Sequence, residues 1–486
     1  MTPAVPSPPP DRLPDGYAVR LDPRVRQRPD GALLGGSPLR LMRLSARARS
    51  LLADGRVVVR DATTAELAGR LLDAGLAVPD LPDRRPDDVT VVIPVLDRPM
   101  ELARLLTALR ADPATAGLPV VVVDDGSVVP VAASDGVRIV RWAESRGPAA
   151  ARNAGLRTAT TAFVAFLDSD CVPRTGWLER LAPHLADPRL AVVAPRIEAL
   201  GGGGGSWLGE YEAAVSALDM GPEPAAVRPL SAVSYLPSAA LLARRSALGA
   251  GFDESMRVAE DVDLVWRLAG AGWRVRYEPA AQVAHEHPAR TTDWVRRRAF
   301  YGTGAALLAA RHGGAVAPLV LAPESALAWA LAVVAGRWGR GAAAGVLGIT
   351  SVRLARRLAR PGEPLPLAFA AGLVLRGQAA SGQALARAVT RHHWPLAVAV
   401  ASVSGKARRG ILALAAADAV AAWWPQRHRV GPVRFVAARR LDDLAYGTGL
   451  WWGALRSGSP RALLPARPPR LAGKNTPAGR NDRPVP

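Results

Sequence analysis

The chain has 486 residues, which is enough for two or three domains with a large hydrophobic core. Its one cysteine, Cys171, excludes a disulfide framework and points to a reducing compartment. The formal net charge of +20 is uneven: residues 290–486 hold 29 Lys and Arg against 7 Asp and Glu, so the first 289 residues carry about −2. No zinc-finger, helix-turn-helix or RNA-recognition pattern accompanies the basic residues, which disfavours nucleic acid as a partner and favours an anionic membrane surface.

Residues 1–13 are rich in proline and lack the basic and apolar segments of a signal peptide. We therefore expect disorder there, and a catalytic part that stays in the cytosol. Residues 14–82 combine short strand patterns with two short helices, which predicts a small winged-helix-like α+β domain without evident catalytic residues. It is either a packing domain or a peptide-docking domain, in which a ligand adds a strand to the edge of a sheet.

After a charged, proline-rich linker, residues 88–290 alternate apolar strands with helical segments. The expected strands cover residues 89–95, 120–123, 137–140, 163–167 and 190–194. Such a pattern is typical of a parallel, doubly wound sheet, so the predicted fold class is α/β. No Gly-x-Gly-x-x-Gly follows the first strand and no Walker lysine loop is present, which disfavours a dinucleotide oxidoreductase or an ATPase.

The strand over residues 163–167 leads directly into Asp168 and Asp170. In an open α/β sheet, ligands bind at the carboxyl ends of the strands. Two carboxylates separated by one residue are expected to face the same side, where they would be hard oxygen ligands for a divalent cation such as Mg²⁺ or Mn²⁺. A metal held there could carry a diphosphate, although Asp-x-Asp is also common in solvated turns.

Further acids follow neighbouring strands, at Asp97 and at Asp124 and Asp125. Acids gathered at one edge suit a ligand that has ribose hydroxyls, an imide N–H and a metal-bound pyrophosphate. Later in the chain, Glu260 and Asp261 open a helix. Glu260 is interpreted as a partner of the helix dipole, whereas Asp261 could take a proton from an acceptor hydroxyl.

His285 and His287 are two residues apart on an expected strand and therefore share a face. A lone histidine is more often structural than a metal ligand. Beside Asp170, however, His285 is an equally reasonable third metal ligand, and both interpretations stay open at this stage.

Taken together, five motifs in this order resemble family 2 glycosyltransferases of the GT-A fold, which are inverting enzymes that use nucleotide-sugar donors. The match spans residues 89–287. The motifs are Val-Val-Ile-Pro followed by Asp-Arg, Val-Asp-Asp-Gly-Ser (123–127), Ala-Arg-Asn-Ala-Gly (151–155), Asp-Ser-Asp (168–170) and Glu-Asp-Val-Asp-Leu (260–264).

The resemblance implies a role for each acid. Asp124 or Asp125 would bind the uracil, Asp168 the ribose and Asp170 the metal, and Asp261 would be the general base. The residues implied to bind the nucleotide sugar are Pro94, Asp97, Asp124, Asp125, Arg152 and Asp168; those implied to hold the metal are Asp170, Asp168 and His285. The Gln-x-x-Arg-Trp motif of processive polysaccharide synthases does not follow Asp263, which disfavours that activity.

The whole-chain arrangement is similar to family members that glucosylate a peptide-derived redox cofactor or its precursor. It implies β-linked transfer of glucose, from UDP-glucose, to such an acceptor. Two alternatives remain. The basic apolar tail also suits an enzyme that acts on a polyprenyl phosphate or cell-wall glycan, and a non-catalytic membrane scaffold with a peptide-binding module would share the same layout.

Residues 291–456 are expected to be helical, alanine-rich and basic, and 457–486 a disordered tail. No apolar run there reaches the roughly 18–20 residues that a membrane span needs. We expect helices packed against one another at the cytoplasmic face of the cell membrane, with Arg and Trp at the interface; one or two true spans are the alternative.

Overall fold

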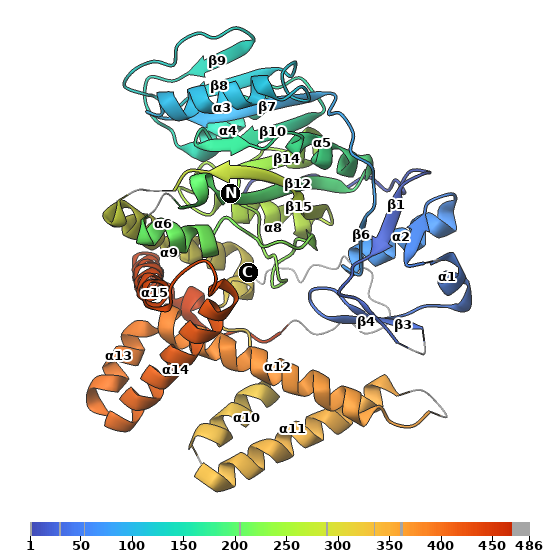
Figure 1. Cartoon of the computed structure of the whole chain (residues 1–486), viewed down its shortest axis with the longest axis vertical. Helices are drawn as coiled ribbons and strands as arrows, with labels where there is room; N and C mark the ends of the chain where they lie inside the picture. Colours follow the sequence, from blue (N-terminus) through green and yellow to red (C-terminus); the bar gives the residue numbers. More distant parts are fainter. Residues whose placement is uncertain are drawn as a thin grey trace, which may run out of the picture.

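The computed structural model describes residues 2–28, 31–52, 54–203, 206–287, 290–334, 336–359 and 363–468. A small N-terminal domain lies beside a large α/β domain, and a set of helices extends from the α/β domain (Figure 1). The expected fold class, α/β with a helical C-terminal region, is confirmed.

The N-terminal domain consists of two three-stranded sheets and two helices around a core that includes Val19, Leu71 and Leu76. Asp61 caps the longer helix, because its carboxylate accepts a hydrogen bond from the backbone of Thr64. The first sheet is β5 (Arg56–Val58), β1 (Ala18–Leu21) and β6 (Ala77–Pro79), the second is β2 (Arg26–Gln27), β3 (Ala32–Gly35) and β4 (Arg40–Arg43), and the helices are α1 (Ala46–Leu51) and α2 (Ala62–Asp73).

The proline-rich N-terminus differs from the expected disorder. The carbonyl of Pro3 accepts a hydrogen bond from Arg267 at 3.1 Å, and that of Pro6 accepts one from the indole of Trp273 at 2.6 Å. Leu13 is buried. An extended proline-rich segment leaves its carbonyls unpaired, and here the side chains of the α/β domain supply the donors.

The large domain is built on a nine-stranded mixed sheet, whose valine-rich strands are buried on both faces. Strands β10, β7, β8 and β9 are parallel, and β12 is parallel to β15, as a doubly wound fold requires. The strands are β7 (Val89–Val95), β8 (Val120–Asp124), β9 (Val137–Arg141), β10 (Phe163–Leu167), β11 (Cys171–Pro173), β12 (Leu190–Ala199), β13 (Ala225–Ala226), β14 (Ala240–Arg244) and β15 (Arg274–His285).

Helices cover both faces of this sheet. Val91 and Ile93 point to the face covered by α3 (Pro99–Ala111) and α5 (Trp177–Leu181), whereas Val92 points to the other face. That second face is covered by α4 (Pro148–Thr158) and α8 (Glu260–Gly270). The amino ends of α4 and α8 both lie near the carboxyl end of β10, where side-chain contacts connect them to Asp168. Two shorter helices, α6 (Trp207–Val215) and α7 (Arg245–Leu248), complete the domain.

In the described part of the chain, seven α-helices follow the expected boundary at residue 290. The first of them is ion-paired to the α/β domain, through Arg311 to Asp253 at 2.7 Å and His312 to Asp263 at 2.9 Å. The seven are α9 (Thr291–His312), α10 (Pro323–Val334), α11 (Gly336–Leu358), α12 (Leu367–Arg387), α13 (Trp394–Val403), α14 (Gly405–Trp423) and α15 (Pro432–Arg456).

Within the described ranges, none of these helices has the length and apolarity that crossing a membrane requires. Of the tail expected to be disordered, residues 457–468 are placed: a short 3₁₀ helix covers Pro460–Leu463, and Ala466 pairs with Val320. Residues 469–486 lie outside the described part of the chain.

Candidate active site

A line of opposite charges crosses the carboxyl edge of the sheet. Arg152, in α4, is buried and donates to Asp168 at 2.6 Å and to Glu260 at 3.0 Å. Asp168 follows β10 and Glu260 opens α8, so the guanidinium joins the neighbouring elements α4 and β10 to a helix that starts 108 residues after Arg152. Because a buried Arg needs anionic partners, this arrangement fixes both carboxylates at the edge. Glu260 therefore does more than complement the helix dipole.

Asp261 lies beside this cluster. Its carboxylate accepts hydrogen bonds from the backbone N–H of Val262 at 2.8 Å and of Ser238 at 3.2 Å. Burial raises the pKa of Asp261, against the opposing effect of these N–H groups and of Arg152. Burial and the neighbouring charge of Asp261 also raise the pKa of Glu260 to about 7. A carboxylate with a raised pKa is a better proton acceptor than a surface aspartate, which suits Asp261 to general-base work.

Asp170 turns to a different partner from Asp168. The turn that follows β10 leads into β11, which pairs Cys171 with His285 of β15. One carboxylate oxygen of Asp170 consequently lies 3.3 Å from Nε2 of His285, and the other accepts a 2.5 Å hydrogen bond from Arg98. Although burial alone would raise the pKa of Asp170, His285, Arg98 and Arg297 hold it below its usual value.

These contacts bear on the expected metal site. A carboxylate and an imidazole facing each other are a donor pair that Mn²⁺ and similar cations accept. Asp168 is not part of the pair, because Arg152 binds it. Across the described ranges, no group of three or more His, Cys, Asp or Glu side chains is close enough to hold a metal. The residues therefore fit a cation held by Asp170 and His285, with its other ligands supplied by substrate phosphates or water.

Asp124 and Asp125 are bound by the protein itself. Asp124 is fully buried, accepts from the backbone of Ser127 at 2.9 Å and is ion-paired with Arg141. Asp125 accepts from the N–H groups of Arg146 at 2.7 Å and Gly147 at 2.9 Å, just before α4. In this structure, both carboxylates order the loops that follow β8 and precede α4. A base N–H would have to share one of these oxygens.

Pro94 lies in β7, and Asp97 lies in the turn that follows this strand. Asp97 is exposed and has a φ of +53°, a backbone conformation that Asp adopts more readily than most residues. Its carboxylate accepts from the N–H of Val128 at 2.7 Å, and its own N–H donates to Ser127. The side chain therefore connects the loop after β7 to the loop after β8, next to half-buried Pro94.

Sequence reasoning missed several residues of this region. Arg98 binds Asp170, and Arg297, Arg298 and Tyr301 of α9 line a small cavity next to His285 and His287. Glu212 of α6 accepts from Trp294 at 2.8 Å and is ion-paired with Arg298. The available signal is the run from Trp294 to Arg298, which comes soon after the matched residues 89–287 end. The sequence interpretation assigns it to the basic helical region 291–456.

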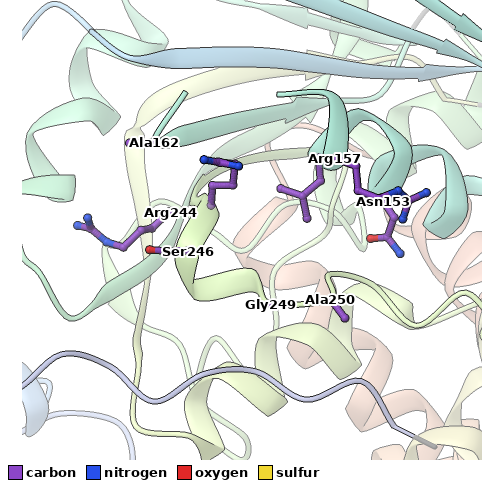
Figure 2. A pocket seen from close by; sticks show the side chains of 9 residues that line it. Asn153, Arg157, Ala162, Arg244, Ser246, Gly249 and Ala250 are labelled. Atoms are coloured by element: carbon purple, nitrogen blue, oxygen red, sulfur yellow. The ribbon is translucent and has the colours of Figure 1, made fainter. Parts of the chain in front are cut away.

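A larger cavity than this one lies elsewhere in the described structure. It has a volume of about 730 Å³ and is bordered by α4, α7 and the start of β10, with Arg157, Arg244 and Ser246 around it (Figure 2). Ala162, at its rim, precedes β10, whereas Asp168 follows that strand. The cavity is therefore at the opposite edge of the sheet from the charged cluster, and Arg244 is already bound to backbone carbonyls at Leu185 and Leu190.

The sequence of this chain was compared with known proteins. The family model "Glycosyl transferase family 2" matches residues 90–248. The pre-mycofactocin glycosyltransferase of Mycobacterium tuberculosis is 48% identical over 471 residues, which are 93% of this chain and 98% of that protein. Glycosyltransferase AglE of Haloferax volcanii is 31% identical over 133 residues, 26% of this chain and 44% of AglE.

A comparison of structures gives the mannosyltransferase PcManGT of Pyrobaculum calidifontis, solved in complex with GDP-Man and Mn²⁺. The likeness covers 75% of this chain and 90% of that one, with 20% identity and a TM-score of 0.36. The match to the family model and the near full-length relative decide the assignment, and they confirm what the five motifs predict: this chain belongs to glycosyl transferase family 2.

Proposed function

We propose that this protein is a metal-dependent, inverting glycosyltransferase of mycofactocin biosynthesis, which moves glucose from UDP-glucose to pre-mycofactocin or its peptide-derived precursor in a β linkage. One observation carries the proposal: a chain 48% identical to a pre-mycofactocin glycosyltransferase along nearly its whole length keeps an intact acid cluster at the carboxyl edge of its sheet. Inverting glycosyl transfer uses a general base beside the donor, and the raised pKa of Asp261, next to Asp168 and Arg152, supports Asp261 in that role.

The residues of the chain would act as follows. Asp261 accepts the proton of the acceptor hydroxyl while that oxygen forms a bond to the anomeric carbon of the donor. The bond from this carbon to the diphosphate breaks on the opposite side, so one displacement inverts the configuration. Arg152 holds Asp168 in place through a hydrogen bond of 2.6 Å. In the proposed reaction, its positive charge would stabilise the negative charge that develops on the leaving diphosphate.

Asp170 and His285 would hold the divalent cation. When bound, such a cation neutralises charge on the diphosphate as it leaves. Asp170 stays ionised at neutral pH because its pKa is held low, so it is available as a ligand there. Arg98 is ion-paired with the same carboxylate, at 2.5 Å from Asp170. It would therefore compete with the cation for Asp170, or be displaced when the cation binds.

The test is transfer by the purified full chain. UDP-glucose with Mn²⁺ is expected to glycosylate pre-mycofactocin, and mass spectrometry would show a gain of one hexose for each transfer. GDP-mannose and UDP-N-acetylglucosamine, assayed in parallel, test the donor. NMR of the product tests the anomeric configuration: a β linkage from the α-linked donor supports inversion, and an α linkage contradicts it.

The acceptor is tested by comparing transfer to pre-mycofactocin with transfer to other acceptors. Transfer to a polyprenyl phosphate or a cell-wall glycan, without transfer to pre-mycofactocin, would replace the acceptor but keep the enzyme class. If calorimetry with Mn²⁺ detected no nucleotide-sugar binding at all, the non-catalytic scaffold would replace the proposal.

We propose that the N-terminal domain contributes to acceptor binding by adding a peptide strand to a sheet edge. Among the described residues, the outer strands β4 and β2 are paired on one side only, and an unpaired edge offers backbone donors and acceptors to an extended peptide. The domain is attached to the α/β domain by Ser37, which accepts from the N–H of Ala232 at 2.6 Å, and by Arg274 to Asp73 at 2.8 Å. The expected result is that a precursor peptide binds the full chain in calorimetry; no detectable binding would leave the packing role.

A further inference from the structure

Helices α13 and α14 form a hairpin, residues 394–423, with an unusual surface. Of the ten residues of α13, eight are Ala, Val, Leu or Trp, yet none is buried. Leu396, Val398 and Val400 are each at least half exposed, and Val403 is 85% exposed. A helix of a soluble domain normally buries one apolar stripe against a core, so an apolar helix with no buried residue calls for a partner outside the described chain.

The turn of this hairpin is positively charged. Lys406, Arg408 and Arg409 lie at the start of α14 and all three are exposed. Residues 394–417 contain no Asp or Glu, so the turn and both adjoining helix ends carry a charge of +3. The first acid beyond them, Asp418, is buried and ion-paired with Arg439 and Arg440. Apolar side chains next to unopposed cations are the pattern of an interfacial helix on an anionic lipid surface.

A second group of exposed apolar residues lies on the same side of the molecule. Helices α10 and α11 present Leu327, Val333 and Trp338, of which the last two are more than three-quarters exposed. In Figure 1 the α13–α14 hairpin and the α10–α11 pair both lie at the lower end, away from the parallel strands β7, β8 and β9. Trp338 also has Arg337 over its ring, and tryptophan and arginine are residues that favour the membrane–water interface.

Geometry limits how deep the contact can be. At 1.5 Å per residue, the ten residues of α13 extend about 15 Å, roughly half of a bilayer's hydrocarbon thickness. The hairpin can therefore lie on a bilayer or insert its tip, but α13 cannot cross it. A second copy of this chain is a poorer occupant, because pairing two hairpins would bring two +3 turns together without an acid between them.

We propose that the hairpin of residues 394–423 is a peripheral membrane-docking element, which inserts the apolar face of α13 into an anionic bilayer and holds it there through Lys406, Arg408 and Arg409. The α10–α11 pair touches the same surface. This proposal concerns attachment only, and vesicle binding can be measured without any turnover, so its failure is distinguishable from failure of the proposed enzymatic function.

The experiment is co-sedimentation of the full chain with vesicles of phosphatidylcholine alone or mixed with phosphatidylglycerol. Binding is expected to the anionic vesicles, to fall with added salt, and to weaken at least about tenfold in the variant K406E/R408E/R409E. The matched control is R47E/R138E/R174E, which makes the same change in net charge at three exposed arginines outside the helical region and should bind nearly as the native chain does.

A second variant tests the apolar contact. In L396S/V398S/V400S the charge is unchanged and no buried side chain is altered, so the fold and the transfer rate to a soluble acceptor should stay as they are. Vesicle binding should nevertheless fall. Three outcomes would overturn the proposal. The first is equal vesicle binding by the charge-reversed hairpin and its control, and the second is full vesicle binding by the serine variant. The third is that the variants keep their vesicle binding but form smaller oligomers than the native chain, as measured by light scattering.

Discussion

Two groups of aspartates lie along the same edge of the sheet, and the structure uses them differently. Asp124 and Asp125 accept hydrogen bonds from backbone N–H groups of neighbouring loops, and an Arg is paired with the first. These partners stabilise the ionised form, and the pKa of Asp124 is lowered even though burial alone would raise it. The two carboxylates are anchored.

Asp261 belongs to the other group. It shares Arg152 with Asp168 and Glu260, so three acids lie around one cation, and its pKa is raised by burial. Acids at the same edge of a sheet can therefore differ in pKa and in role, because their partners and their burial differ. The partners of Asp124 outweigh its burial and lower its pKa, whereas the two N–H donors of Asp261 and the charge of Arg152 do not outweigh burial, so its pKa is raised. An acid of the second kind is the better proton acceptor.

The largest effect is expected from Asp261→Asn. The amide cannot accept the proton of the acceptor, so kcat should fall by about 10²- to 10⁴-fold, the range typical of a lost general base. The dissociation constant for UDP-glucose, measured by calorimetry, should change little, because the proposed role of Asp261 involves the acceptor hydroxyl and not the nucleotide. An unchanged kcat would show that Asp261 is not the base and would remove the distinction between the two groups.

Asp124→Ala tests the anchored group. The substitution leaves the N–H groups of Ser127 and Val131 without their acceptor and Arg141 without its carboxylate, so the free energy of unfolding should fall by about 2–4 kcal/mol. Chemical denaturation would measure it. Asp261→Asn is the matched control: it removes a carboxylate that burial disfavours, and stability should hold or rise slightly. Equal destabilisation by both would contradict the comparison.

The pH dependence of kcat is a further test of the comparison between the two groups of aspartates. Because the pKa of Asp261 is raised, the catalytic carboxylate is lost at a higher pH than for an ordinary aspartate, and kcat should decline as the pH falls through that raised pKa. Glu260→Gln removes a neighbouring negative charge and frees Arg152 to stabilise the Asp261 carboxylate. The acid limb should therefore move to lower pH.

The control for this shift is Glu223→Gln, which removes an exposed glutamate outside the cluster and should leave the limb where it is. If the acid limb moved to higher pH in Glu260→Gln, Glu260 would stabilise the ionised form of Asp261, and the prediction would be wrong.

Much of this edge was predictable from the sequence. Valine-rich runs such as residues 89–95 and 120–123 indicate buried strands, and acids after parallel strands must share an edge. These predictions depend on periodicity and chain order, which are local properties. The role of Asp261 was inferred from its position at the start of a helix and from the family resemblance, and it stays a prediction.

The partners of each acid were not predictable. Asp168 and Asp170 were expected to act together, but a three-residue strand, β11, reverses the chain and carries Asp170 to His285, while Arg152 binds Asp168. So short a strand has no periodic pattern. Likewise, Pro3 and Pro6 are held by donors from residues 267 and 273, and a proline-rich composition gives no sign of such distant partners.

The smallest expected effect concerns Arg98, which binds the carboxylate that would hold the cation. In Arg98→Gln, Asp170 loses a competing positive partner, and Mn²⁺ should bind the donor-free protein a few-fold more tightly in calorimetry. Arg104→Gln is the matched control, because it removes an equal charge from α3 whose partner is Glu286 and not Asp170. If both variants bind Mn²⁺ alike, general charge is responsible and Arg98 does not compete. Weaker binding in Arg98→Gln would place the cation away from Asp170, since removing a competitor at its true ligand can only favour it.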